Sequence, residues 1–502
     1  MSKILFATIM GGYKFATKLE NLLGDKLIDM GHDVQYLICD AVIPSCQMLK
    51  VSRVAPEVLT RENKPFDFCS TCVPEGINSL KGKTIRRISE FLKQDDFKFA
   101  SDLADSVSLD NLINFEFMNT KVGMHAKAGA IRYFAKRSIE SEINHKLVLR
   151  KYVESSVLAL RAIDRFYSTE GFDKFVINHG IYVPQGPLTE YARSRVHVVT
   201  WNPSYRESTF IFSHHESYHY AMQSESNDVW QHDLTPDEKI TLFEYLQSRR
   251  SGKNDWIKFS DSQSSINCSI DFEIDREYEK VFVALTSVVW DAELHYQSRA
   301  FDSMFDWIDA TIDFFSKRPN LALIIRVHPA EVLAPTRSRE SVEDYLRVKY
   351  VNLPENVKVI SAGDKISTYS IIEKSDVILI YNTKTGIEAA CMGKPVVVAG
   401  EAWIKGKGFS YDAYSPSEYE IELERSVSNL LYVDLDLAQK YAFHFFFRRM
   451  IELDVKVEES GGKLGTPSYG VKMDQNSKIK DQNLDRVTAA ILDAKLSFHG
   501  IN

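Results

Sequence analysis

The stretch YNTKTGIEAACMGKPV, residues 381–396, decides how the second half of this chain folds. An apolar run at 377–381 leads into it, a helical pattern follows at 386–392, and a second apolar run comes at 395–399. This order predicts a strand, a helix and a further strand. Because such units build a parallel sheet covered by helices, the segment predicts one step of a doubly wound α/β domain.

The same alternation extends in both directions along the chain. Around the quoted stretch, strands are predicted at 280–285, 321–327 and 357–360, and helices at 301–315 and 369–374. The first half has its own set, with strands predicted at 4–9, 34–38, 175–178 and 196–200, a helix at 13–30, and mostly helical segments at 88–97 and 109–165. The fold class expected is α/β, with two doubly wound Rossmann-like domains facing a cleft, which is the default ligand site.

A change of composition marks the expected connection between the domains. Residues 247–269 are rich in Ser, Asn, Asp, Lys and Gly and have little apolar periodicity. The domains predicted are therefore 1–265 and 270–435, followed by a helical segment and tail at 436–502 that returns to the first domain.

The chain has 502 residues, of which 44% are hydrophobic, and a formal net charge of -8. Its length suffices for two large domains. Because no uncharged apolar stretch approaches the roughly 18–20 residues that span a bilayer, and no leader pattern opens the sequence, a cytoplasmic protein is expected. The mildly acidic balance argues against nucleic acid as a partner.

A candidate anion site lies where the strand at 377–381 gives way to the helix. Thr383 and Thr385 offer hydroxyl groups, Gly386 lets a phosphate approach the backbone, and Glu388 could accept hydrogen bonds from a ribose. The alternative interpretation is that Thr383 or Thr385 merely caps the helix, with Glu388 completing a capping box.

A second candidate group is the sequence RVHP at 326–329. His328 follows an apolar strand and precedes a proline, so it is predicted to reach the same cleft and donate to a phosphate oxygen. Arg326 lies two positions earlier, on the same face of the strand, and either adds charge to the site or forms a structural pair with a carboxylate.

These motifs together resemble the capsule polysaccharide biosynthesis family of glycosyltransferases, which have two Rossmann-like domains in the arrangement called GT-B. The resemblance rests on a strand that ends in His-Pro, followed by a segment of the form Thr-Gly-x-Glu-Ala and then Gly-Lys-Pro-Val. Its supporting segments are 356–360, 367–369, 375–377 and 400–412. It covers residues 280–412 well and the first half of the chain loosely.

The resemblance implies transfer of a sugar from a nucleotide-sugar donor to a cell-surface polysaccharide or a lipid-linked glycan. Donor-binding residues would be Thr286, Ser287, His328, Thr383, Thr385, Gly386, Glu388, Lys405 and Lys407. No cofactor and no catalytic metal are expected, since His328 and lysines would neutralise the leaving phosphate. The Asp-x-Asp pair at 434–436 precedes a helical pattern and is interpreted as a cap or surface feature.

The candidate for the base that activates the acceptor hydroxyl is His179, which follows a predicted strand in the first domain. A histidine hydrogen-bonded within its turn is the alternative interpretation. His214, His215 and Asp40 are weaker candidates.

Four of the six cysteines, Cys39, Cys46, Cys69 and Cys72, lie close together in the sequence. Four thiolates could hold a structural zinc ion, and buried thiols are the alternative. The segment around Cys39 and Cys46 also resembles a cysteine-bearing segment of some surface-carbohydrate proteins.

The aromatic and basic segment 441–449 has two interpretations. It is either a core helix or a peripheral contact with the inner face of a membrane that carries the acceptor.

Two further functions share this architecture. One is a sugar-nucleotide 2-epimerase, which needs a converging set of carboxylates that the sequence does not indicate. The other is a non-catalytic nucleotide-sugar-binding assembly component, which would keep the donor site and transfer nothing.

Overall fold

The computed structural model describes residues 1–61, 67–108, 110–139, 142–250, 255, 278–292, 299–334, 336–461, 467–472 and 478–499. The chain forms two units: unit 1 comprises Met1–Ala221 and Arg449–Asn502, and unit 2 comprises Met222–Arg448.

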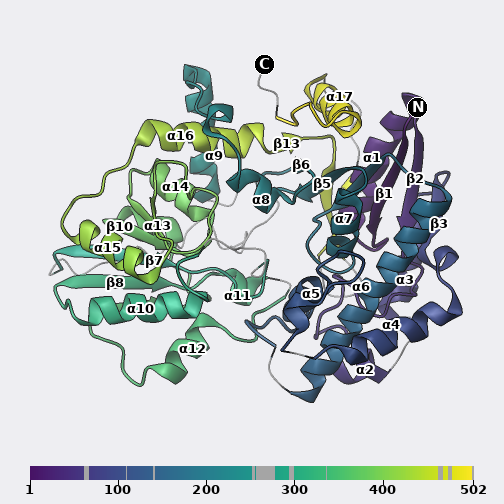
Figure 1. Ribbon diagram of the computed structural model, residues 1–502. Coiled ribbons are helices and arrows are strands. Elements are labelled where there is room, and N and C mark those ends of the chain that lie inside the picture. The colour runs from purple at the N-terminus through teal and green to yellow at the C-terminus, as the bar shows by residue number, and fades with distance from the viewer. Residues whose placement is uncertain are drawn as a thin grey trace. The chain divides into compact units, whose positions relative to one another are not determined.

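A seven-stranded sheet organises unit 1, with the order β13-β6-β5-β4-β1-β2-β3. Its strands are β1 (Lys3–Ile9), β2 (Asp33–Ile38), β3 (Thr84–Arg87), β4 (Lys174–Asn178), β5 (His197–Pro203), β6 (Thr209–His214) and β13 (Ile451–Glu452). The five from β5 to β3 run parallel, whereas β6 and β13 pair antiparallel. The central strands β1 and β4 are buried and mainly apolar after their first residue because helices cover both faces of the sheet (Figure 1).

The helices of unit 1 are α1 (Lys14–Asp29), α2 (Pro56–Arg61), α3 (Asp67–Ser79), α4 (Gln94–Ser106), α5 (Val122–Phe134), α6 (Ile143–Thr169), α7 (Gln185–Arg193) and α17 (Lys478–Leu492). The short helix α8 (Tyr218–Gln223) spans the division between the units.

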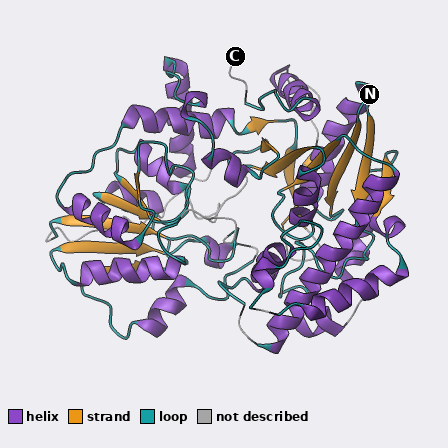
Figure 2. Ribbon diagram, viewed as in Figure 1, coloured by secondary structure: helices purple, strands orange, loops and turns teal. Residues whose placement is uncertain are grey.

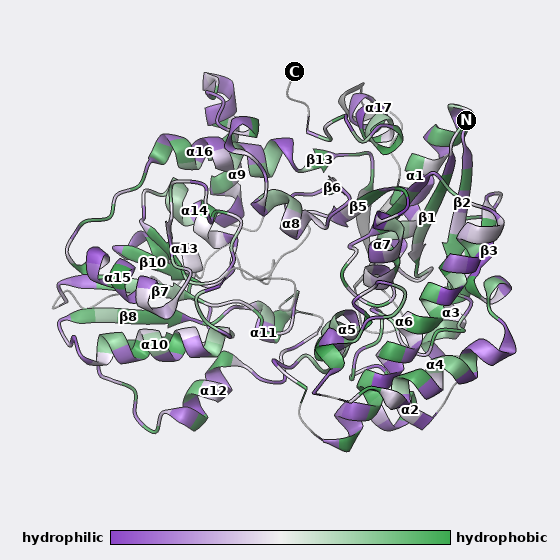
Figure 3. Ribbon diagram, viewed as in Figure 1, coloured by the Kyte–Doolittle hydropathy of each residue, from purple (hydrophilic) through white to green (hydrophobic). Residues whose placement is uncertain are grey.

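Unit 2 contains a six-stranded parallel sheet with the order β12-β11-β10-β7-β8-β9. Its strands are β7 (Lys280–Leu285), β8 (Leu321–Arg326), β9 (Val357–Ile360), β10 (Val377–Ile380), β11 (Val396–Val398) and β12 (Tyr411–Asp412). Its helices, seen with these strands in Figure 2, are α9 (Pro236–Arg250), α10 (Met304–Ser316), α11 (Ala330–Leu333), α12 (Val342–Lys349), α13 (Thr368–Glu373), α14 (Thr385–Cys391), α15 (Pro416–Val427) and α16 (Leu435–Phe443). Figure 3 shows β8 and β10 as hydrophobic, in keeping with the full burial of both.

The direction of strand addition reverses once in each sheet. In unit 2 the reversal falls between β7 and β10, and in unit 1 it falls between β1 and β4. Doubly wound sheets bind ligands at the carboxyl ends of the strands beside such a reversal. The prediction of two doubly wound α/β domains is confirmed, and each has a defined place for a ligand.

The boundaries between the two units differ from the domain boundaries predicted from the sequence. The divisions fall after Ala221 and after Arg448, whereas the boundaries predicted from the sequence were 265–270 and 435–436. The physical reason is that α9 packs on α16 within unit 2. The rings of Tyr245 and Phe446, for example, lie 5.0 Å apart.

The aromatic segment 441–448 belongs to the core of unit 2. Tyr441, Phe445 and Phe446 are each fully buried, and the ring of Phe445 lies 5.3 Å from that of Trp403. This burial favours the core interpretation over a membrane-facing one. Asp434 caps α16, since its Oδ1 accepts a hydrogen bond from the N–H of Leu437 at 2.9 Å, as the sequence predicts.

The last part of the chain lies in unit 1. β13 pairs with β6, and α17 contacts α1 and β4. Before α17, β14 (Lys456–Gly461) and β15 (Pro467–Lys472) pair antiparallel as a separate two-stranded sheet.

Within the part of the chain that the structure describes, no helix has the length and apolar character that crossing a membrane requires.

Candidate functional site

His328 lies directly beyond the carboxyl end of β8, and its backbone is held by the end of β7. Its N–H donates to Thr286 Oγ1 at 2.9 Å, and its Nδ1 accepts from the N–H of Ala330 at 3.0 Å. Because Nδ1 acts as an acceptor, the neutral imidazole carries its proton on Nε2. The local hydrogen bonds therefore make Nε2 a donor.

His328 is neutral at pH 7. Burial, with the nearby Lys384 and Arg326, lowers the pKa of His328 to about 4. Arg326 itself is buried and donates to the carbonyl oxygens of Asp364 and Ile366, both at 3.3 Å. Arg326 therefore has a structural role and fixes the segment after β9. Its partners there are backbone carbonyl oxygens, not the carboxylate that the structural alternative named.

The ends of β7 and β10 are joined by a side-chain hydrogen bond. Ser287, two residues beyond β7, donates to Asn382 Oδ1. Next to Asn382, the Thr383 hydroxyl lies 3.2 Å from the Thr385 hydroxyl and accepts from the Thr385 N–H at 3.4 Å. The Ser287–Asn382 bond thus joins the segments that follow β7 and β10 at the reversal of strand order in unit 2.

The capping-box interpretation of Thr385 and Glu388 is wrong. The Thr383 hydroxyl accepts from the first N–H of α14, but the N-cap residue Lys384 makes no side-chain cap and the carboxylate of Glu388 binds other side chains. Gly386 is required for packing: a Cβ there would lie 2.6 Å from Ile380 Cδ1 and 3.0 Å from Ile404 Cδ1. Glycine at this position lets α14 approach the sheet closely.

A buried ion pair links α9 to α14. Arg249 Nε lies 3.1 Å from Glu388 Oε1, and the two side chains are 7% and 2% exposed. The hydroxyl of Tyr369 donates to Glu388 Oε2. Burial alone would raise the pKa of Glu388, but Arg249 and Lys384 lower it below its ordinary value, so the carboxylate is ionised.

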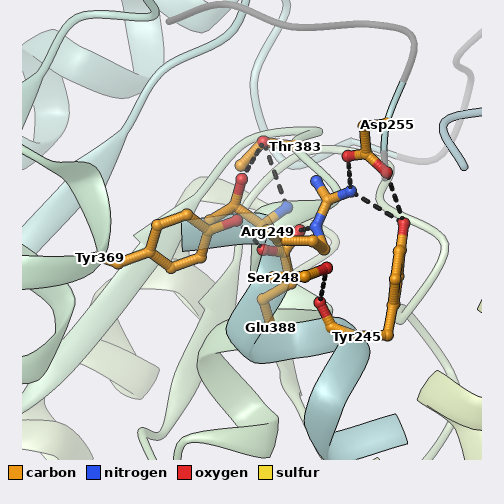
Figure 4. Close-up of polar contacts among 8 residues, drawn as sticks. Tyr245, Ser248, Arg249, Asp255, Tyr369, Thr383 and Glu388 are labelled. Carbon is orange, nitrogen blue, oxygen red and sulfur yellow. Dashed lines mark hydrogen bonds and ion pairs between the residues drawn. The ribbon is translucent and has the colours of Figure 1, made fainter. Parts of the chain in front are cut away.

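A second carboxylate completes this network, as Figure 4 shows. The Arg249 guanidinium pairs with Asp255, and its Nη1 donates to the Tyr245 hydroxyl at 3.1 Å. That hydroxyl in turn donates to Asp255 Oδ1 at 2.8 Å. Arg249 is therefore fixed between two carboxylates, one on each side.

Lys384 adds a titratable cation beside this network. It precedes α14, and burial together with Arg249 lowers its pKa to about 7, although Glu388 and Asp255 act in the opposite direction. Its charge is thus poised to change near neutral pH, and an anion placed beside it would favour the protonated form.

Lys405 and Lys407 are buried and bind backbone carbonyls. Lys405 Nζ donates to Gly400 O at 3.0 Å and Ala413 O at 2.7 Å. Lys407 Nζ donates to Gln223 O at 3.3 Å and Glu225 O at 2.8 Å. These bonds hold the loop between β11 and β12 in place, and the donor contacts suggested for the two lysines stay a prediction.

His179 lies in unit 1, at the carboxyl end of β4, with a left-handed backbone at φ 64°. Its ring packs 5.3 Å from Tyr182 and 5.9 Å from His219. Burial and Arg132 lower the pKa of His179 to about 3, below the value that suits a general base at neutral pH. Of the other candidates, His214 contacts His197 at 2.9 Å and Asp40 accepts from the Ser89 N–H at 3.2 Å.

The cysteines Cys39, Cys46, Cys69 and Cys72 line one cavity in unit 1. None of the described cysteines forms a disulfide. Burial raises the pKa of Cys39 to about 12, so in the absence of a bound cation its thiol stays protonated.

Sequence reasoning missed Arg249, Asp255, Tyr369 and Lys384. The first two fall in or beside the segment interpreted as a connection between domains, where a charged side chain carries no periodic signal. Lys384 lies between the two threonines of the predicted anion site, but a lysine there carries no pattern that distinguishes it from a surface lysine.

Residues 264–438 match the family model described as capsule polysaccharide biosynthesis protein. The match agrees with the predicted family over these residues, which include β7 to β12, His328, Thr383, Lys384 and Glu388 but not Arg249 or Asp255. The match supports a part in capsule polysaccharide biosynthesis, which agrees with sugar transfer, and an epimerase is not better supported.

Solved structures also resemble the chain. The beta Kdo 2,4 transferase of KpsC from Thermosulfurimonas dismutans is 14% identical, with 60% of this chain and 85% of that chain covered and a TM-score of 0.36. The beta Kdo 2,7 transferase of KpsC from the same organism is 13% identical, with 66% and 89% covered and a TM-score of 0.37. A putative UDP-N-acetylglucosamine 2-epimerase from Listeria monocytogenes is 11% identical, with 88% and 90% covered and a TM-score of 0.27. No curated protein matches the chain.

Replacing Gly386 with alanine should destabilise unit 2, because the new methyl group overlaps Ile380. Overpacking of this kind costs about 1–3 kcal/mol. Thermal unfolding of Gly386→Ala against the wild type measures the effect. Gly363→Ala is the matched control, since a Cβ at this exposed position meets no atom within 4 Å. Equal melting temperatures for the two variants would contradict the packing role of Gly386.

Proposed function

We propose that unit 2 binds the phosphate groups of a nucleotide-sugar donor where the order of its strands reverses. The observation that carries the proposal is that His328, the Thr383 and Thr385 hydroxyls and Lys384 all follow the carboxyl ends of β8 and β10, which flank β7, and that Lys384 is close enough to lower the pKa of His328. The acceptor would be a cell-surface glycan or a lipid-linked saccharide.

Each of these groups has a defined task in the proposed reaction. His328 offers a neutral N–H donor to a phosphate oxygen, and the threonine hydroxyls offer further donors. Lys384 supplies charge when protonated, so that the phosphate can leave with the electrons of the bond to the sugar. The proposed transfer is metal-independent, with the charge supplied by the chain's own residues.

Glu388 is a positioning residue in this proposal. Its partners Arg249 and Tyr369 occupy both carboxylate oxygens, so it holds Arg249 in place beside Lys384. The ribose contact suggested by the family resemblance stays a prediction for Glu388.

His179 remains the residue proposed as the base. The neutral ring of His179 can take up a proton. For efficient catalysis, binding of the sugar acceptor would have to raise the pKa of His179 from its value of about 3. An acceptor-side carboxylate or phosphate would act in that direction.

The first test is a thermal-shift screen of the purified chain against CMP, UDP, GDP and their sugar conjugates. A ligand at a hundred times its Kd stabilises the folded state by about 2.7 kcal/mol, so a true donor should raise the melting temperature. His328→Ala should reduce that shift, because losing a hydrogen bond to a charged group costs about 1.5–3 kcal/mol.

Two further variants make the screen specific. His328→Gln keeps an N–H donor and should retain part of the shift, whereas His232→Ala changes an exposed histidine of the same unit and should retain all of it. A shift that is equal in wild type and His328→Ala would place the nucleotide elsewhere and refute the proposed site.

Donor affinity should also depend on pH through Lys384. Below its pKa of about 7, Lys384 is already protonated and binding needs no proton. Above that value the complex must take up a proton, so the Kd should rise by up to about tenfold per pH unit. Calorimetric titrations with a nucleotide sugar, whose phosphates stay ionised, measure this slope between about pH 6 and about pH 9.

Lys384→Met should bind the donor weakly and with a flat pH profile. Lys374→Met, which removes an exposed lysine of unit 2, should keep the wild-type slope. Because His328 is neutral across this range, His328→Gln should weaken binding without changing the slope. A slope that persists in Lys384→Met would show that another group takes up the proton.

A further inference from the structure

Two arginines of unit 1 converge on the loop that follows β2. Arg132, in the last turn of α5, donates from Nη1 to Gln47 O at 2.7 Å. Arg53, which belongs to the loop itself, donates from Nη1 to Met48 O at 3.2 Å. Lys50 of the same loop interacts electrostatically with both guanidinium groups. Three cationic side chains therefore gather around one short stretch of backbone.

This group of cations lies beside the expected ligand-binding edge of the unit 1 sheet. The Arg132 guanidinium is 5.0 Å from the ring centre of Tyr182, and that ring is 5.3 Å from the ring of His179, which directly follows β4. The N–H of Gln47 donates to Val183 O at 2.8 Å, which ties the loop to the same segment. Because the strand order of this sheet reverses between β1 and β4, a ligand of unit 1 is expected at their carboxyl ends.

The charges of the two arginines are not offset by acidic side chains. Among the residues that the structure describes, neither Arg53 nor Arg132 forms an ion pair with a carboxylate. Arg132 Nε is buried and has no hydrogen-bond partner there. Burial raises the pKa of the Cys46 and Cys72 thiols near Arg53, so both stay neutral and supply no counter-charge. A bound anion would supply it.

The comparison with Arg326 separates this group from a purely structural one. Arg326 is fully enclosed and spreads its nitrogens over the backbone carbonyls of Asp364 and Ile366. Arg53 and Arg132 are half-buried, and within the described part of the chain each donates to one backbone carbonyl. A guanidinium has five N–H donors in a planar fork, so both arginines keep donors for a ligand.

We propose that Lys50, Arg53 and Arg132 bind an anionic group, a carboxylate or a phosphate, on the sugar acceptor. The inference rests on the proposed function, in which unit 1 holds the acceptor. The guanidinium fork matches the paired oxygens of both groups. An acceptor anchored in this way would be held beside His179, the proposed base.

The bound anion would also act on His179. Burial, together with the charge of Arg132, keeps the pKa of His179 at about 3. An anion on Arg132 offsets that charge and so raises the pKa of the histidine. An acidic acceptor would thus improve the base that takes up the proton of its own hydroxyl group, which a neutral sugar would not do.

The test is calorimetric titration of the full chain with probes that differ in charge. An oligomer of galacturonic acid is compared with its neutral methyl ester, and glucose 6-phosphate is compared with glucose. At least one anionic probe should bind about tenfold or more tightly than its neutral counterpart. A preference in the first pair identifies a carboxylate as the anchored group, and a preference in the second identifies a phosphate. No preference in either pair would overturn the proposal.

Variants locate the binding site. Arg53→Gln and Arg132→Gln should each weaken the anionic probe about tenfold or more, because each loses a hydrogen bond to a charged group. Arg132→Lys keeps the charge and should retain part of the affinity. Arg87→Gln removes an exposed arginine at the end of β3 and should bind as the wild type does. Wild-type affinity in an Arg53→Gln/Arg132→Gln double variant would refute the assignment. The comparison of charged and neutral probes on the wild type stands even if a variant fails to fold.

Failure of this inference can be told apart from failure of the proposed function. The nucleotide-dependent thermal shift reports on unit 2 and should be unchanged in Arg132→Gln. A nucleotide shift without any preference for anionic sugars would overturn only the anion site of unit 1. Anionic sugars that bind through Arg132, with no shift from any nucleotide, would instead contradict the donor site of unit 2.

Discussion

The ion pair between Arg249 and Glu388 is the interaction on which the candidate site depends. Both side chains are buried, and a charge without a partner in such a place costs several kcal/mol. The pair therefore fixes where α9 and α14 lie within unit 2. Because Lys384 precedes α14, the same pair also sets the electrostatic surroundings of the residues beyond β10.

This constraint explains why so few charges at the site are available to a ligand. Arg249 is satisfied by two carboxylates, Arg326 by backbone carbonyls, and Lys405 and Lys407 by loop carbonyls. Lys384 differs, since its surroundings leave its protonation state undecided near neutral pH. An anion bound beside Lys384 would therefore increase the positive charge of the site near neutral pH.

Much of the fold followed from short apolar runs, because parallel strands that helices cover on both faces must be apolar throughout. The strand ends, and with them His328, Thr383 and Thr385, were predictable for the same reason. The partners of Glu388 were not, since Arg249 lies far from it in the sequence and outside any periodic pattern. Gly386 shows a second limit of prediction from sequence. A glycine in the first turn of a helix fits phosphate binding and close packing equally well. Only the positions of Ile380 and Ile404 in the structure favour packing.

The pairing of β13 with β6 has a consequence for how the protein is made. Residues 451–452 complete a sheet whose other strands lie before residue 215, so unit 2 is inserted into unit 1. At a synthesis rate of about 5–20 residues per second, the ribosome needs roughly 10–50 s to deliver β13 after β6. During that interval β6 is an open sheet edge on a nascent chain, the kind of surface that pairs with other strands or recruits chaperones.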